Sequence, residues 1–130
     1  MSLNDSLRIS STGLTAERFR MDVISSNIAN ANTTGINGVN PYRRRVVELV
    51  GTNQGVEIAG VVKDKTPFGE KVDFSDPNHD PKTGLVKTSN VQPVVEMVDM
   101  MGASRAYQAN VEAFKSAKGM IQDALTIGKV

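Results

Sequence analysis

The chain has 130 residues and a formal net charge of +1, from 15 basic and 14 acidic side chains. This balance lacks the basic excess of a nucleic-acid-binding domain, and the absence of cysteine excludes disulfides and thiolate chemistry. No apolar run approaches the ~18 residues of a transmembrane helix, so we expect no direct membrane insertion. The N-terminal residues lack the basic and hydrophobic regions of a cleaved signal peptide, which predicts retention in the cytoplasm or export by another route.

The N-terminal segment is predicted to form a long helix, from about residue 3 to about residue 31. Apolar residues spaced by three and four form one seam, at Leu3, Leu7, Leu14, Met21, Ile24, Ile28 and Ala31. A second apolar side contains Ile9, Ala16, Phe19 and Val23. A helix that is apolar on two sides needs more than one neighbour. Its own domain could supply both, but we expect part of this surface to contact other subunits.

The middle of the chain, residues 32–92, is predicted to be a loop followed by a small β-rich region. Asparagine, glycine and a proline dominate residues 32–41, a composition typical of turns. Strands are expected at 42–50, 56–63 and 71–74, with a short one at 85–87, because these stretches carry β-branched and apolar residues.

The C-terminal segment, Pro93–Ile127, is predicted to be a second long helix with a heptad-like seam. The seam positions are Met97, Met100, Ser104, Tyr107, Val111, Phe114, Lys118, Ile121 and Leu125. At ~1.5 Å per residue this helix is too long for a small globule to cover on all sides. We therefore predict that subunits meet along the two seams, at Leu7, Leu14, Met21, Ile24, Ile28, Met97, Met100, Tyr107, Val111, Phe114, Ile121 and Leu125.

The predicted fold class is α+β: two long terminal helices in an antiparallel, coiled-coil-like pair, with a small β-rich middle segment. We expect one domain over residues 1–130, divided into an N-terminal helix (1–31), a loop and β-rich middle (32–92) and a C-terminal helix (93–127).

Two polar clusters are candidate sites of chemistry. His79 is the one histidine and has Asp73, Asp76 and Asp80 nearby, but the prolines of this loop separate them and no nucleophile motif is present. We expect no metal, cofactor or enzymatic activity. The basic run 43–45 is interpreted as solvated charges at a strand edge. Nucleic acid is disfavoured as its ligand, and pairing with carboxylates of a neighbouring subunit stays open.

Two motifs give the chain a family resemblance. Ser26-Asn27-Ile28-Ala29-Asn30 followed by Asn32-Thr33-Thr34-Gly35 resembles the S-N-[LI]-A-N-x-x-T-x-G signature of bacterial flagellar rod, hook and related axial proteins. The run 104–112, SRAYQANVE, is similar to their C-terminal signature, and 125–128 to their usual ending. The motif residues are Ser26, Asn27, Asn30, Thr34, Gly35, Arg105, Tyr107, Gln108 and Asn110. The short middle segment and the insertion at 35–38 most resemble the proximal-rod subgroup.

The resemblance implies a structural subunit of the proximal rod of the flagellar basal body. Such a subunit would leave through the flagellar type III export apparatus without a cleaved signal. It would polymerise in the periplasm by axial helix packing, forming the drive shaft and the wall of the export channel. The implied partners are further copies of itself, other proximal-rod proteins, the distal rod protein and the adaptor that joins the rod to the membrane ring. The alternative is a soluble helical-hairpin adaptor or export chaperone whose seams are satisfied internally.

Overall fold

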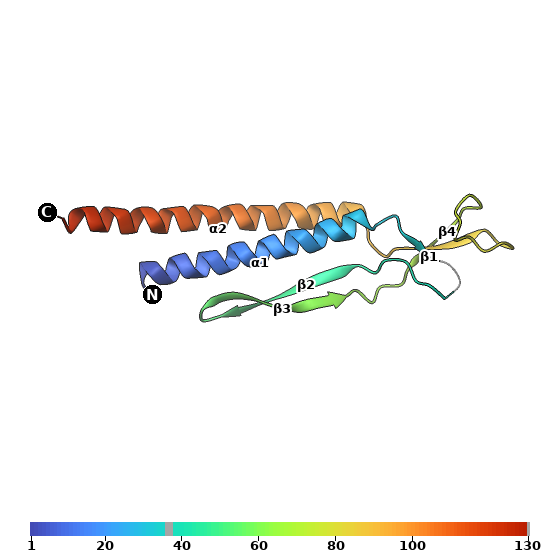
Figure 1. The fold of residues 1–130 in the computed structure, drawn as a ribbon, viewed down its shortest axis with the longest axis horizontal. Helices are drawn as coiled ribbons and strands as arrows, with labels where there is room; N and C mark the ends of the chain where they lie inside the picture. The colour runs from blue at the N-terminus through green and yellow to red at the C-terminus, as the bar shows by residue number, and fades with distance from the viewer. Residues whose placement is uncertain (36–37, 130) are drawn as a thin grey trace. The chain divides into compact units, whose positions relative to one another are not determined.

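The computed structural model of this chain describes residues 1–35 and 38–129. The elements follow the order α1 (Leu3–Ala29), β1 (Thr34–Gly35), β2 (Arg45–Thr52), β3 (Gly55–Lys63), β4 (Gly69–Val72), β5 (Leu85–Thr88) and α2 (Pro93–Ile127) (Figure 1). Two long helices enclose a short β-rich middle in the sequence, which confirms the predicted α+β class. Positions 36 and 37, part of the insertion noted above, lie outside the described residues. No helix of the described chain combines the length and the apolar character needed to cross a membrane.

The strands form two small sheets. β2 and β3 pair as a hairpin, and the other sheet has the order β1-β5-β4. In the second sheet β5 is antiparallel to both neighbours, with Thr34 opposite Thr88 and Glu70 opposite Lys87. β1 was not predicted from the sequence. It has only two residues, and a partner more than 50 positions away makes it a strand.

By its contacts the chain divides into two compact units, which are described separately. Unit 1 contains 1–21, 47–60 and 101–130, and unit 2 contains 22–46 and 61–100.

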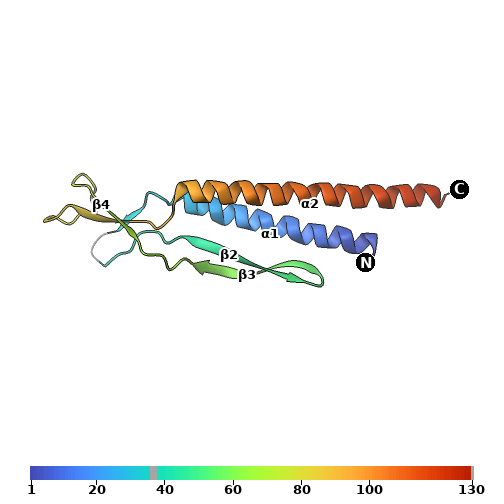
Figure 2. The ribbon, with the colours of Figure 1, turned by 180° about the vertical axis from the view of Figure 1, so that it is seen from behind.

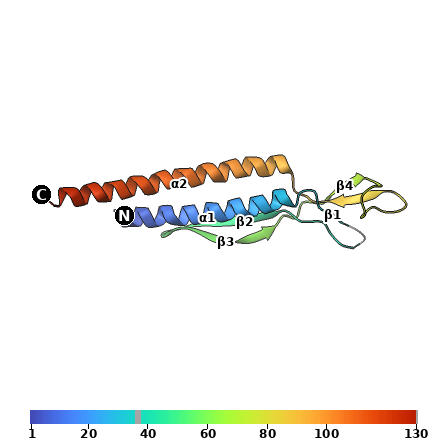
Figure 3. The same cartoon turned by 45° about the horizontal axis from the view of Figure 1, so that its top comes forward.

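In unit 1, α1 has neighbours on two sides. Thr12 Oγ1 accepts a hydrogen bond of 3.1 Å from the Val56 backbone N–H of the hairpin. The next residue, Gly13, faces Asn110 of α2, whose amide group would lie within 3 Å of an added Cβ. Figure 1 and its reverse view, Figure 2, show this part of α1 between α2 and the hairpin, and in Figure 3 it lies against β2 and β3. Within unit 1, α1 therefore has two neighbours in its own chain, α2 and the hairpin, and contacts of its apolar surface with other subunits stay a prediction.

The helices of unit 1 run antiparallel (Figure 1), and their buried residues are small. Ser10 and Ala16 of α1 and Ala103 and Ala117 of α2 are all buried. Small side chains let two helix backbones approach closely. These buried positions are offset from the predicted seams: Ala103 and Ala117 each precede a seam position by one residue, and Ala16 belongs to the second apolar side of α1.

Unit 2 has a small core with an unusual share of polar residues. Its buried apolar side chains are Ile24, Ala31, Val86 and Val91. Asn27, Ser89 and Glu96 are equally buried, and both Asn27 and Glu96 are 0% exposed. Because a buried polar group is costly unless it is hydrogen-bonded, these residues must form an ordered network.

Candidate functional site

Asn27 lies in the last turn of α1 and uses its whole side-chain amide. Its Nδ2 donates to the Arg45 carbonyl (2.8 Å) and to Glu96 Oε2 (3.0 Å). Its Oδ1 accepts from Tyr42 Oη (2.9 Å) and from the Arg45 N–H (3.0 Å). These bonds fill the two donors and two acceptor positions of an amide. Asn27 thus joins the end of α1 to the beginning of β2 and to the first turn of α2.

Arg44 completes the network with three carboxylates. Its Nε donates to the buried Glu96, and its terminal nitrogens donate to Asp64 (3.2 Å) and Asp99 (3.1 Å). A guanidinium suits this arrangement because its donors point in several fixed directions. Since Glu96 is 0% exposed, Arg44 is the group that compensates the charge of this carboxylate.

The charges of this network alter the pKa of two members. Burial alone would lower the pKa of Arg44, but hydrogen bonds and charge attraction from Glu96 and Asp64 outweigh it and raise this pKa. The pKa of Asp64 is lowered below 3.8, first by hydrogen bonds from the Thr66 hydroxyl and N–H and then by Arg44. Both residues are held more firmly in their charged forms.

The loop before α2 fastens to the same place. Ser89 Oγ donates to the Tyr42 carbonyl (2.6 Å), and the Asn90 side chain accepts from the Arg44 N–H (2.7 Å) and donates to the carbonyls of Asp64 and Thr66. Within the described residues, no buried side-chain nitrogen or oxygen is left without a partner. We name the set Asn27, Tyr42, Arg44, Asp64, Ser89, Asn90, Glu96 and Asp99 the junction network. Its arrangement suits a fixed structural connection.

The other N-terminal motif residues shape the chain around Asn27. Asn30 directly follows α1, and its Nδ2 donates back to the carbonyl of Ser26 in the last turn of the helix (2.8 Å). The Thr34 hydroxyl accepts from Asn78 Nδ2 (2.8 Å). Gly35 is buried, and an added Cβ would overlap the Val39 carbonyl and the ring of Pro41. The motif thus contains residues needed for hydrogen bonding and one needed for close packing.

The C-terminal motif residues lie in unit 1, on α2. Arg105 and Gln108 are exposed, whereas Tyr107 and Asn110 are half-buried. Asn110 Nδ2 donates to the Ala106 carbonyl (3.0 Å) while its side chain packs over Gly13.

The predicted interface residues are mostly half-buried in the single chain. Ile24 is buried, whereas Met97 and Leu125 are 54% and 64% exposed. The half-buried members are Leu7, Leu14, Met21, Ile28, Met100, Tyr107, Val111, Phe114 and Ile121. Their role in contacts between subunits stays a prediction.

Arg44 corrects the interpretation of the basic run. We expected solvated charges at a strand edge, but Arg44 is largely buried and binds carboxylates of its own chain. The signal that could have located it is the pair of acidic residues, Glu96 and Asp99, at the start of a helix rich in valine and methionine. Sequence alone could not show that a residue 52 positions earlier reaches Glu96.

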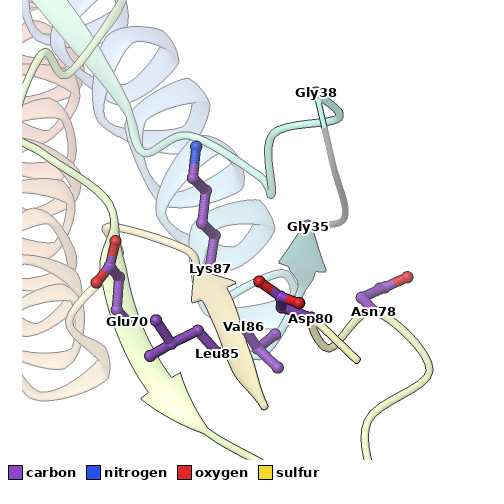
Figure 4. Close-up of a pocket in the computed structure, with 8 residues that line it drawn as sticks. All are labelled: Gly35, Gly38, Glu70, Asn78, Asp80, Leu85, Val86 and Lys87. Atoms are coloured by element: carbon purple, nitrogen blue, oxygen red, sulfur yellow. The ribbon is translucent and has the colours of Figure 1, made fainter. Parts of the chain in front are cut away.

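A second polar cluster surrounds a cavity of about 230 Å³ between the second sheet and the loop before β5 (Figure 4). Gly35, Glu70, Val86 and Lys87 line it from the three strands, and Asn78 and Asp80 from the loop. Glu70 and Lys87 are opposite each other on paired strands. Nearby, His79 Nδ1 lies 2.5 Å from the Asp76 carbonyl, and its ring is 5.8 Å from that of Phe74. In the described parts of the chain, no three histidine or acidic side chains come together as a metal site would require.

Comparisons with known proteins agree with both motifs. Residues 7–35 match the family described as "Flagella basal body rod protein", and 82–127 match "Flagellar basal body rod FlgEFG protein C-terminal". The chain is 38% identical to "Flagellar basal-body rod protein FlgC" of Bacillus subtilis, covering 99% of this chain and 100% of the relative. It is 40% identical to the proteins of that name from Borreliella burgdorferi, covering 98% of each, and Escherichia coli O157:H7, covering 99% and 100%. The chain therefore belongs to the FlgC family of flagellar basal-body rod proteins.

Proposed function

We propose that this chain is a structural subunit of the proximal rod in the flagellar basal body. The observation that carries the proposal is similarity over almost the whole chain to rod proteins, at 38 to 40% identity in the relatives above. Because the match runs through both helices and the middle, it includes every element that a rod subunit would use.

The junction network supports a mechanical role. It ties the end of α1, the start of β2 and the first turn of α2 together through Asn27, Arg44 and Glu96. A fully satisfied buried network makes such a connection rigid. A subunit that transmits torque needs this rigidity where its helices meet its β-rich part.

The surface of α2 supports polymerisation. In unit 2, Val94, Met97 and Val98 are 73%, 54% and 59% exposed and lie on one side of the helix. Apolar side chains in such a group favour burial against another protein. Contacts between unlike faces of successive subunits generate a helical filament, the symmetry of a rod.

Partners and location follow from this assignment. The subunit would contact further copies of itself, other proximal-rod proteins, the distal rod protein and the adaptor to the membrane ring. It would reach the periplasm through the flagellar type III export apparatus and form part of the drive shaft and channel wall. The charged residues of the junction network are used for structure, which supports a role other than that of an enzyme.

The adaptor or chaperone alternative is less well supported, because the relatives described above are rod proteins. The test is to replace Tyr107 or Val111, both half-buried on α2, with aspartate and to follow export and rod assembly separately. We expect the chain to be exported but absent from purified basal bodies. Gln122→Asp, at an exposed position of the same helix, is the control and should assemble. Normal rods and motility in both seam variants would contradict the proposal.

A further inference from the structure

Unit 2 has a cavity with a basic and aromatic lining. It measures about 320 Å³, and its lining includes Tyr42, Arg43, Arg45, Lys63 and Phe68. Among the described residues that line it, none is acidic. Three cations around one concave surface repel each other, so an anion bound there would be stabilised.

These cations differ from the neighbouring Arg44. The Arg43 guanidinium donates to the carbonyls of Asp64 (2.8 Å) and Thr66 (3.0 Å) and lies 4.1 Å from the centre of the Phe68 ring. The Arg45 guanidinium lies 5.6 Å from the centre of the Tyr42 ring. Within the part of the chain that the structure describes, neither arginine nor Lys63 forms an ion pair with a carboxylate. An aromatic ring lies beside each arginine, and carbonyls accept from Arg43, so the charges of these cations are left for a ligand.

The lining defines the class of ligand. Arginine and lysine bind carboxylates, and the rings of Tyr42 and Phe68 add an apolar surface beside the charges. A peptide segment that carries both carboxylates and an aromatic side chain would match this lining.

The chain itself contains such a segment. Residues 73–80 carry Asp73, Asp76 and Asp80, and Phe74 within them is 62% exposed. Asp73 pairs with Lys71 at 3.3 Å. Asp76 and Asp80 are half-buried and accept backbone hydrogen bonds from Asn78 (2.7 Å) and Lys82 (2.9 Å), but neither forms an ion pair among the described residues. The segment therefore offers two carboxylates without a cation and one exposed aromatic ring. We name residues 73–80 the acidic loop.

We propose that the cavity lined by Arg43, Arg45 and Lys63 binds the acidic loop of a second copy of this chain. The proposal rests on the proposed function, because it assigns one contact between successive subunits of the rod. The contact joins two different surfaces, the cavity of one copy and the acidic loop of the next. It can therefore repeat along an assembly without closing into a dimer, as a helical filament requires.

Disulfide cross-linking tests the contact directly, because the chain has no cysteine of its own. Two copies with different tags are produced in the same cells, one with Lys63→Cys and one with Asp76→Cys, and basal bodies are purified. We expect a cross-linked pair that contains both tags, since a disulfide forms only when the two Cα atoms come within about 7 Å. Lys118→Cys, exposed in unit 1, replaces Lys63→Cys in the control and should give no pair.

A charge exchange gives an independent measurement. Lys63→Glu alone or Asp80→Lys alone should reduce the fraction of chain found in basal bodies by about tenfold, corresponding to ~1.4 kcal/mol. The two changes in one chain should restore it, because the carboxylate introduced at position 63 then faces the ammonium group introduced at position 80. Recovery also shows that the single variants had not simply failed to fold.

The outcomes separate this proposal from the one on which it rests. Chain present in basal bodies without the mixed cross-link overturns the contact and leaves the rod assignment intact. A cross-link from Lys63→Cys to a different rod protein also overturns it, since the ligand then belongs to another partner. Absence of the unchanged chain from purified basal bodies would overturn both proposals.

Discussion

Asn110 of α2 lies directly over Gly13 of α1, so closely that a Cβ atom added at Gly13 would stand 2.8 Å from Asn110 Nδ2. The amide cannot move away freely, because it donates to the Ala106 carbonyl at 3.0 Å. The pair therefore fixes how closely the two helices approach in unit 1. It also explains why an asparagine of the family motif lies on a helix face that is otherwise apolar.

Gly13→Ala should destabilise the chain although alanine is the better helix former. Overpacking typically costs about 1–3 kcal/mol, and the gain in helix propensity returns about 1 kcal/mol. We expect a net loss of about 1 kcal/mol in the free energy of unfolding, measured with urea. Gly102→Ala is the matched control: nothing lies within 4 Å of its added Cβ, so it should stabilise. A stabilising Gly13→Ala would contradict the close contact.

Asn27→Ala should cost far more than Asn30→Ala. The first removes four hydrogen bonds inside unit 2, whereas the side chain of Asn30 makes one bond, to the Ser26 carbonyl. Unpartnered buried groups cost about 1–3 kcal/mol each, so we expect a loss of at least ~3 kcal/mol for Asn27→Ala. For Asn30→Ala the loss should be about 1 kcal/mol. Thermal and urea unfolding of the two variants measure the difference, and equal losses would show that Asn27 is not central.

Arg44→Ala should be more damaging than the loss of a surface arginine. It leaves the buried Glu96 without its counter-charge, a situation that typically costs about 3–5 kcal/mol. Arg44→Lys keeps a charge but loses the directed donors, so its free energy of unfolding should lie between those of Arg44→Ala and the unchanged chain. The double variant Arg44→Met with Glu96→Leu should recover much of the loss. No recovery in urea unfolding would mean that Arg44 acts independently of Glu96.

The stability contributed by Asp64 should depend on pH in one direction. Its pKa in the folded chain is below 3.8, because Thr66 and Arg44 favour the charged carboxylate. This stabilisation is complete above the ordinary aspartate pKa of 3.8. It is lost as the pH falls through the lower pKa that Asp64 has in the folded chain. Asp64→Asn should therefore be less stable than the unchanged chain at neutral pH, and the difference should narrow in acid. A gap that stays constant down to about pH 2 would contradict the assignment.

The sequence predicted the helices well because their signal is local. Leucine, isoleucine and methionine recur along α1 and α2 at a spacing that a helix alone explains, and Pro93 begins α2. The longer strands were also predicted, since runs of β-branched residues carry them. β1 was missed because two residues have no periodicity, and only pairing with Lys87 and Thr88 makes Thr34 and Gly35 a strand.

The junction network could be predicted only in part. The resemblance marked Asn27 as important, but its partners Tyr42, Arg45 and Glu96 lie 15, 18 and 69 residues away along the chain. Contacts over such separations depend on the completed fold. Local patterns could not show that Arg44 turns inward while Arg43 and Arg45 line an open cavity.

Electron cryo-microscopy of intact basal bodies shows directly whether this chain is a structural subunit of the flagellar rod. We predict rod density that fits α1 and α2 side by side, with Val94, Met97 and Val98 covered by a neighbouring subunit. Cells lacking the chain should lose that density. If such cells still build a complete rod, and basal bodies of unchanged cells show no density for this chain, it is not a rod subunit.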